Sequence, residues 1–298
     1  MLDELRAEQN HVTKEGPARQ GPAAGSSYRL AVCLPVWNRS DLFQASFTSL
    51  LRQLAGIEAS IWIFDNGSDA ETARYIESLS CEEHRLFKVF LPQNMGIPFV
   101  VNIFSQLVTQ DCEFAGYRAP AHVMVADADA YFKKPVQDMI EILEGNSHFA
   151  VISGHDSIEH ETIAEVPYPF RGQTIIVRVK TIERGLCLIM RREILAACVP
   201  FPHHRDRDVD WELMKWHPNS IAARTRQLAV VDYVAHIGLY DSTWHPFGAP
   251  SNPAEIAEVN RILEQEGLFS PERVARMERY CELTNSQAAM RAQAAITV

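Results

Sequence analysis

Hydrophobic residues along the chain form short continuous runs that alternate with segments of helical period. The runs predict strands over residues 28–35, 59–64, 85–92 and 121–126. Between them, residues 40–54, 69–79 and 97–108 place apolar side chains at helical spacing, and Ser40 is the predicted N-cap of the first helix. Strands and helices that alternate at this spacing predict an α/β fold, with a mostly parallel, Rossmann-like sheet and helices on both faces.

The alternation becomes less regular beyond residue 135. Helices are predicted over 135–145 and 192–199, and strands over 148–154, 173–182 and 185–190. The polar, proline-containing segment 155–172 predicts a loop, whereas the run 228–238 predicts one final strand. Two helical segments close the chain, over 253–267 and 270–293, with Ser270 as the N-cap of the second.

These elements divide the chain into three parts. Residues 1–27 are polar and rich in Gly, Pro and Ala, which predicts a mobile tail. Residues 28–250 carry the alternating elements and are expected to form one domain, with its two halves meeting near residue 135. Residues 251–298 are expected to form a C-terminal helical extension.

Composition and charge narrow the class of protein. Hydrophobic residues make up 47% of the 298 residues, which is typical of a globular protein with a sizeable core. A formal net charge of -10 disfavours general nucleic-acid binding, which needs clustered Lys and Arg. No apolar run approaches the roughly 20 residues of a membrane span. The six cysteines form no CxxC pair and lie partly in apolar runs, so we expect reduced thiols and a cytoplasmic protein.

The chemistry is expected where the strands end. In doubly wound sheets, ligands bind beyond the carboxyl ends of the strands. The segments at those ends are residues 35–38, 65–68, 94–96 and 127–129. Asp127 and Asp129 stand one residue apart after a buried run, which suits an Mg²⁺ or Mn²⁺ ion shared with substrate phosphates. In isolation the same pair is equally well explained as a polar turn.

Two further polar residues have an ordinary and a functional interpretation. Asp65 precedes Asn-Gly, which forms tight turns without help, but its carboxylate also suits hydrogen bonds from a nucleotide base. His236 lies at the end of a predicted strand, as many satisfied histidines do. As a third metal ligand it would have to lie beside Asp129.

The segment DRDVDWELMKWH, residues 206–217, holds several acids where a helix is expected to begin near Asp208. Acids favour the first turn of a helix, so a solvated helix start explains them. The alternative is that Asp208 or Asp210 is a general base, with Trp211 forming the wall of its pocket. Glu212 is expected to be solvated.

Six short motifs occur in an order that resembles family 2 of the GT-A glycosyltransferases. They are PVWN, DNGSD, NMGIPFVVN, DAD, RDVDWE and VAHIG, and they cover about residues 29–242. The resemblance implies a GT-A-type sheet, a nucleotide-diphosphate-sugar donor and an Mn²⁺ or Mg²⁺ ion. It also implies that residues 28–135 bind the donor and that residues 136–250 serve the acceptor and catalysis.

The same resemblance implies roles for individual residues. Pro35 and Asp65 would line the base and ribose site, Asp127 would contact ribose or sugar and also take part in the metal site, and Asp129 would bind the metal directly. His236 would contact the metal or the diphosphate, and Asp208 would be the base. Neighbouring predicted donor contacts are Val36, Asn38, Asn94 and Gly96. Arg207 stands where the family usually has an acid, which could move the base to Asp210, and Val101 stands where a basic residue is usual.

The leading hypothesis is therefore a metal-dependent, inverting glycosyltransferase. A nucleotidyltransferase on a related sheet is the first alternative, although PVWNRS lacks the glycines typical of its phosphate loop. A non-catalytic nucleotide-sugar-binding protein is the second. Trp211 and Tyr168 are candidates for stacking on an acceptor. A small molecule, glycan or protein acceptor fits the acidic chain better than a nucleic acid, while the donor sugar and the oligomeric state stay open.

Overall fold

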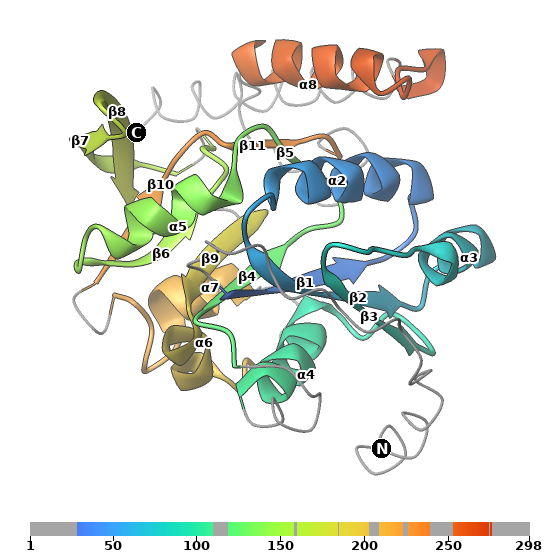
Figure 1. Ribbon diagram of the computed structural model, residues 1–298, viewed down its shortest axis with the longest axis horizontal. Coiled ribbons are helices and arrows are strands. Elements are labelled where there is room, and N and C mark those ends of the chain that lie inside the picture. The colour runs from blue at the N-terminus through green and yellow to red at the C-terminus, as the bar shows by residue number, and fades with distance from the viewer. Residues whose placement is uncertain are drawn as a thin grey trace, which may run out of the picture.

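A computed structural model describes residues 29–109, 119–157, 160–183, 185–202, 209–222, 226–238, 253–273 and 275. The predicted tail, Asp208 and most of the second C-terminal helix lie outside these residues. Within them, the chain forms a nine-stranded sheet and a separate two-stranded ribbon. Helices pack on both faces of the large sheet (Figure 1), so the fold class expected from the hydrophobic pattern is confirmed.

The first four strands form the parallel half of the sheet in the order β3-β2-β1-β4. They are β1 (Arg29–Val36), β2 (Glu58–Asn66), β3 (Arg85–Leu91) and β4 (His122–Ala126). Every residue of β4 is buried, as expected for a strand covered on both faces. Because these strands are parallel, their carboxyl ends lie at one edge of the sheet.

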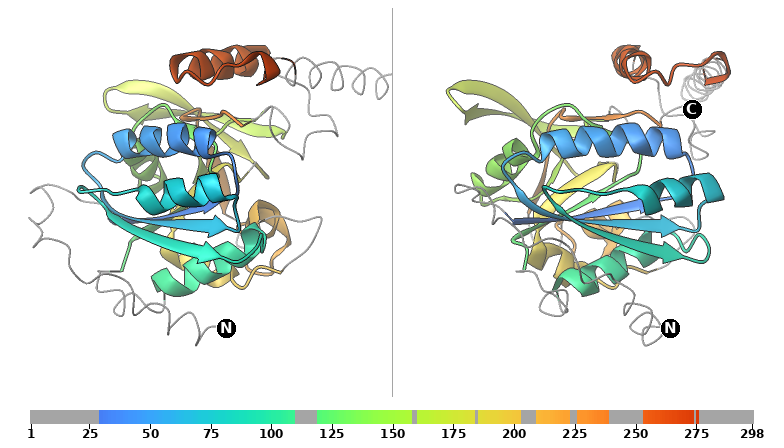
Figure 2. Two further views of the ribbon diagram at one scale, coloured as in Figure 1. Left: turned by 90° about the vertical axis from the view of Figure 1, so that its right-hand side faces the viewer. Right: turned by 45° about the vertical axis from the view of Figure 1, so that its right-hand side comes forward.

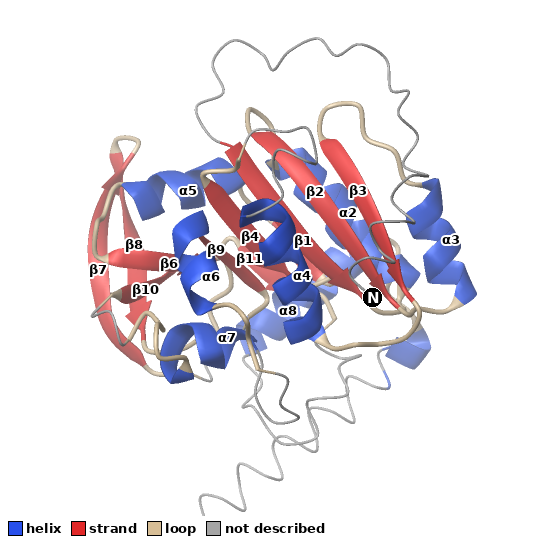
Figure 3. Cartoon of the chain, turned by 90° about the horizontal axis from the view of Figure 1, so that it is seen from below, coloured by secondary structure: helices blue, strands red, loops and turns tan. Residues whose placement is uncertain are grey.

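The second half of the sheet is mixed and continues β9-β6-β10-β8-β7. Its strands are β6 (Phe149–Ser153), β7 (Thr162–Phe170), β8 (Gln173–Lys180), β9 (Cys187–Arg191) and β10 (Gln227–Val230). Among the described strands of this sheet, β8 and β9 run opposite to the rest. The antiparallel β9 separates β4 from β6 (Figure 3).

Two predictions for this half were wrong. The expected loop 155–172 contains β7, which forms a hairpin with β8 and exposes most of its side chains. An edge strand of this kind has no continuous apolar run to reveal it. The expected single strand 228–238 is two strands, β10 and β11 (Val234–His236). They separate because the carbonyl of Gly154 accepts hydrogen bonds from the amides of Tyr233 and Val234, both at 2.8 Å.

The helices form two layers around the sheet. One face is covered by α2 (Ser40–Gln53), α3 (Ala70–Ser78) and α5 (Val136–Glu144), and the other by α4 (Ile97–Thr109), α6 (Arg192–Cys198), α7 (Val209–Trp211) and the π-helix η2 (Glu212–Trp216). Strand β1 shows why both layers form. Leu30, Val32 and Leu34 face the first layer, whereas Ala31 and Cys33 face the second, because successive side chains of a strand point to opposite faces.

Helix α8 (Pro253–Gln265) adds a further layer outside α2 and β11 (Figure 2). Its buried residues Val259, Ile262 and Leu263 pack against Leu42 and Ala45 of α2 and against Ala235 and Ile237. Helix α8, the first helix of the predicted extension, thus packs closely on the domain. None of the helices in the described residues is long and apolar enough to cross a membrane.

Helix α2 does not begin as predicted. Its N-cap is Arg39, in the left-handed conformation with φ 59°, and no side chain caps the helix. Ser40 is the first helical residue, and its hydroxyl donates a hydrogen bond to Glu71. The left-handed turn at Arg39 matters for the site, because it directs this arginine to an aspartate outside α2.

Candidate functional site

The loop after β1 and the turn after β2 form one hydrogen-bonded unit. Val36 is paired with Asp65, so both strands end at the same level. The buried Asp65 carboxylate accepts a hydrogen bond from the amide of Ser68 at 2.9 Å. Asn38 is fixed on both sides, because its amide donates to the Ser68 hydroxyl and its side-chain oxygen accepts from the amide of Asp69. The structure thus brings together the predicted donor residues Val36, Asn38 and Asp65.

The segment after β3 joins the same edge through Asn66. The buried Asn66 side chain donates to the Asn94 side-chain oxygen at 3.0 Å and accepts from the amide of Met95 at 2.8 Å. The Asn94 oxygen also accepts from the amide of Gly96. Gly67 allows this approach, since a Cβ there would lie 2.4 Å from the backbone of Gln93. Asn94 and Gly96 are therefore held beside the end of β2.

The two acids after β4 occupy different surroundings. Val125 is paired with Cys33, so the residues just beyond β4 reach the level of the end of β1. Asp127 is half-buried, and its amide donates to the carbonyl of Leu186 at 2.9 Å. Burial raises the pKa of the Cys33 thiol well above its usual value, and the nearby Asp127 carboxylate adds to that rise. Asp127 therefore lies near Cys33 of β1, whereas Asp129 directly precedes β5 (Ala130–Phe132), which forms the two-stranded ribbon with β11.

Asp129 and His236 meet, although the sequence separates them widely. His236 Nε2 lies 3.4 Å from Asp129 Oδ2, and both side chains are buried. Arg39 Nη1 lies 3.1 Å from the same oxygen. Burial raises the pKa of the Asp129 carboxyl, but His236 and Arg39 together hold that pKa well below its usual range. We call these three residues the Asp129 cluster.

Gly238 closes one side of the Asp129 cluster. A Cβ at this position would lie 1.9 Å from Asp129 Oδ2 and 2.9 Å from Arg39 Nη1. Contacts under 3.0 Å require atoms to move, so a larger residue cannot occupy this position without displacing the carboxylate. The glycine of the VAHIG motif therefore provides the space in which the cluster forms.

The acidic segment is described only in part. Asp208, the predicted base, and the side chain of Trp211 lie outside the described residues. Asp210 is half-buried and packs against Gly185, whose added Cβ would lie 3.4 Å from the Asp210 Cβ. Gly185 precedes Leu186, the partner of the Asp127 amide, so Asp210 lies close to the end of β4. The expectation that Glu212 is solvated was wrong, since it is only 4% exposed in η2.

Tyr168 lies on β7 and packs on the layer of α5. Its hydroxyl lies where a Cβ of Gly145 would be, just after α5. Its side chain packs against the apolar core between the sheet and the layer of α2, α3 and α5. Arg171, at the tip of the same hairpin, forms ion pairs with Asp138 and Glu141 of α5. These contacts anchor the hairpin to α5, and the acceptor role of Tyr168 stays a prediction.

Sequence reasoning gave no individual role to three residues around the site. Trp37, the residue after β1, is 49% exposed. Arg39 completes the Asp129 cluster. His155, which follows β6, is buried, and its ring centroid lies 6.3 Å from that of His236 in an edge-to-face arrangement. The signal for Trp37 was its place in a strand-end loop, whereas Arg39 and His155 become visible only through tertiary contacts.

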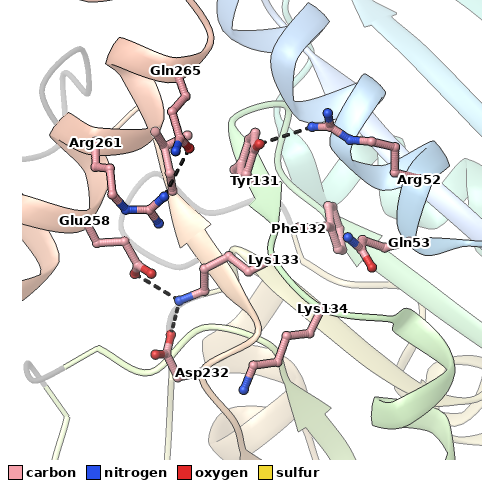
Figure 4. A pocket seen from close by; sticks show the side chains of 11 residues that line it. Arg52, Gln53, Tyr131, Phe132, Lys133, Lys134, Asp232, Glu258, Arg261 and Gln265 are labelled. Carbon is pink, nitrogen blue, oxygen red and sulfur yellow. Dashed lines mark hydrogen bonds and ion pairs between the residues drawn. The ribbon is translucent and has the colours of Figure 1, made fainter.

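A pocket of about 380 Å³ lies between α2, β5 (Ala130–Phe132) and α8 (Figure 4). It is lined by charged and polar side chains, among them Arg52, Lys133, Glu258 and Arg261. None of the predicted donor, metal or base residues that the structure describes lines it. We therefore place the candidate site at the ends of the strands and treat this pocket as part of the junction with α8.

The Asp129 cluster has the donor types of a divalent-cation site. A carboxylate oxygen and an imidazole nitrogen suit Mn²⁺. The ion pair with Arg39 shows that the Asp129 carboxylate already binds a positively charged group. In the described part of the chain, no three or more His, Cys, Asp or Glu side chains are grouped closely enough to hold a metal ion. Two protein ligands are sufficient where substrate phosphates and water supply the others.

Comparisons with known proteins indicate the family of the chain. The sequence model of "Glycosyl transferase family 2" matches residues 31–199. No curated protein matches the chain. Among solved structures, the mannosyltransferase PcManGT from Pyrobaculum calidifontis, in complex with GDP-Man and Mn²⁺, is 16% identical with a TM-score of 0.48, covering 99% of this chain and 87% of that one. Residues 1–349 of S. aureus TarS are 15% identical with a TM-score of 0.46, covering 87% and 71%.

Proposed function

The chain belongs to glycosyl transferase family 2, and on that basis we propose that it transfers a sugar, with inversion, from a nucleotide-diphosphate sugar to an acceptor hydroxyl. We further propose that the reaction needs a divalent cation, Mn²⁺ or Mg²⁺, held by Asp129 and His236. The glycosyltransferase class follows from the family. The cation, the stereochemistry and the role of each residue belong to the proposal.

The observation that supports the proposal most strongly is the convergence of Asp129 and His236. Their nearest atoms are 3.4 Å apart, although one residue follows β4 and the other ends β11. Burying a carboxylate is costly unless a positive charge or hydrogen bonds compensate it. A buried Asp129 beside a histidine, at the edge where the donor residues lie, is thus suited to binding a cation.

Each residue then has a definite task. Asp65, Asn38 and the Asn94 loop would bind the base and ribose, and Asp127 would contact the ribose or sugar. A cation bound by Asp129 and His236 would stabilise the negative charge that develops on the diphosphate. Asp208 or Asp210 would take the proton from the acceptor hydroxyl.

Bonds and charges balance in this scheme. The acceptor oxygen forms a bond to the anomeric carbon while the bond from that carbon to the diphosphate oxygen breaks. The nucleoside diphosphate leaves with the electron pair, and the carboxylate holds the acceptor proton. Attack from the face opposite to the leaving group inverts the anomeric configuration.

A ligand screen followed by a product assay tests the proposal. Thermal unfolding is measured with a panel of nucleotide sugars, each with and without Mn²⁺. A ligand present at 100 times its dissociation constant should add about 2.7 kcal/mol of stability. The donor found in this way is then supplied with candidate acceptors of small-molecule, glycan and protein type. Release of a nucleoside diphosphate is expected, whereas release of pyrophosphate would indicate a nucleotidyltransferase.

The metal part of the proposal has its own test. Asp129→Ala should abolish Mn²⁺-dependent stabilisation by the donor and should abolish transfer. Asp232→Ala is the matched control, since Asp232 is a largely exposed acid that pairs with Lys133. Transfer that continues in Asp129→Ala, or in wild-type protein treated with a chelator, would show that the cation is not required.

A further inference from the structure

The two residues proposed to hold the cation lie on one two-stranded ribbon. Strand β5 pairs with β11 so that Ala130 is opposite His236, and the amide of Ile237 donates to the carbonyl of Asp129 at 3.1 Å. Asp129 directly precedes β5, and His236 ends β11. The ribbon therefore determines how far apart the two side chains lie. A two-stranded ribbon is marginally stable in water unless another element packs on it.

Helix α8 is the element that packs on this ribbon. Its apolar face covers Ala235 and Ile237, the neighbours of His236 on either side. Two polar contacts connect α8 to the β5 strand and the residue after it. Glu258 pairs with Lys133 at 2.9 Å, and Glu266, just beyond α8, accepts from the Tyr131 hydroxyl at 2.7 Å. Figure 4 shows Lys133 between Glu258 on α8 and Asp232.

A second route from α8 passes through His155. Glu255, in the first turn of α8, accepts a hydrogen bond from His155 Nε2 with a separation of 3.0 Å. The His155 ring meets the His236 ring edge to face, with 6.3 Å between centroids. Both rings are buried, since His155 is 3% exposed and His236 is 8% exposed. The contact continues from His236 to Asp129 at 3.4 Å.

We propose that Glu255 and His155 are positioning residues that hold the His236 imidazole in the orientation that binds the cation. The inference rests on the proposed role of His236 at the cation. Glu255 fixes the His155 ring by accepting a hydrogen bond from its Nε2–H, and the fixed ring limits rotation of the His236 ring by contact. In metalloproteins, hydrogen-bonding groups behind the ligands often carry out this task, and here the His155 ring would do so by packing. Helix α8 would then contribute to the cation site by supporting His236.

The proposal is tested by comparing two glutamates of the same helix. Glu255→Ala removes the contact with His155. Glu258→Ala, the matched control, removes one of two acids from Lys133, which keeps Asp232. Glu255→Gln keeps an acceptor oxygen and tests rescue. Imidazole ¹⁵N signals of His236, assigned with His236→Ala, are recorded without metal, and Mn²⁺ affinity is measured by electron paramagnetic resonance on the full chain.

The expected result is specific to position 255. Glu255→Ala should shift the His236 imidazole signals and weaken Mn²⁺ binding about tenfold, at the low end of the range for residues behind metal ligands. Glu255→Gln should recover part of both effects, and Glu258→Ala should show neither. A fall in thermal stability alone does not support the proposal, because a carboxylate in the first turn of α8 also stabilises the helix.

The other outcomes separate this inference from the proposed function. Unchanged His236 signals in Glu255→Ala, or unchanged Mn²⁺ affinity beside a wild type that binds Mn²⁺, would overturn the inference. Equal effects in Glu255→Ala and Glu258→Ala would also overturn it, because the helix would then act as a whole. If wild type binds no Mn²⁺ while the His236 signals still shift in Glu255→Ala alone, the positioning contact stands and the metal proposal fails.

Discussion

Arg39 Nη1 lies 3.1 Å from Asp129 Oδ2, the same oxygen that lies 3.4 Å from His236 Nε2. The guanidinium reaches this oxygen because Arg39 adopts a left-handed conformation before α2. A divalent cation bound by Asp129 would therefore share the carboxylate with a permanent positive charge. The two cations are expected to compete, so that Arg39 stabilises the metal-free protein and weakens metal binding.

Replacing Arg39 tests this competition. Arg39→Met removes the positive charge and keeps much of the apolar stem. We expect Mn²⁺ to bind about tenfold more tightly in the absence of donor, which equals about 1.4 kcal/mol. Isothermal titration calorimetry with Mn²⁺ alone gives the affinity. Arg52→Met is the control. Arg52 lies in the last turn of α2 and contacts Tyr131 and Glu266. Weaker Mn²⁺ binding in Arg39→Met would contradict the competition.

Gly238 provides a steric test of the same cluster. In Gly238→Ala, the new Cβ would lie 1.9 Å from Asp129 Oδ2 in the present geometry, so the carboxylate must move. We expect Mn²⁺ binding to fall at least tenfold while the circular dichroism spectrum stays that of the wild type. Gly185→Ala is the control, because its Cβ meets no atom closer than 3.4 Å. Equal Mn²⁺ affinity in Gly238→Ala and wild type would place the cation elsewhere.

The parallel half of the fold was predictable because local pattern and tertiary structure agree there. Strands β1 to β4 are continuous apolar runs, and the residues at their carboxyl ends meet as the doubly wound topology requires. The places of Asp65, Asn94 and Asp127 at the ends of the strands were predictable in this way. Their positions follow from strand order and register, which the alternation of strands and helices indicates.

The second half was less predictable because its contacts are distant in sequence. Strand β11 has three residues and pairs with the equally short β5, so no periodic pattern identifies either. The approach of His236 to Asp129 was expected only from the family resemblance. Glu212 was misjudged because η2 turns its side chain into the protein, and acids in a helix start usually face water.

The identity of the catalytic base can be decided with two isosteric variants. Asp208→Asn is expected to lower kcat by about 10² to 10⁴ while leaving donor affinity intact, because a general base acts on the acceptor proton alone. Steady-state kinetics and donor titration give the two quantities. Asp210→Asn is the comparison, since Asp210 packs against Gly185 close to the end of β4. Near-normal turnover in Asp208→Asn with a large loss in Asp210→Asn would assign the base to Asp210.

The ion pair between Asp41 and Arg273 should make part of the stability depend on pH. Arg273 Nη2 lies 2.8 Å from Asp41 Oδ2, which joins α2 to the segment after α8. Burial raises the pKa of Asp41, but hydrogen bonds from Arg273 and from the amide of Leu42 lower that pKa below its ordinary value. A carboxylate with a lowered pKa stabilises the fold above its unfolded pKa of about 3.9. That contribution is lost as the pH falls through the folded pKa.

A double-mutant cycle with Asp41→Asn and Arg273→Met isolates this contribution from other effects. Because Asp41 is 46% exposed, we expect a coupling free energy of about 0.5 kcal/mol at neutral pH, as for other solvent-screened pairs. Urea unfolding of the four proteins at about pH 7 and about pH 3 measures it, and the coupling should shrink at the lower pH as Asp41 takes up a proton. Equal coupling at both pH values would show that the Asp41 carboxylate does not carry the interaction.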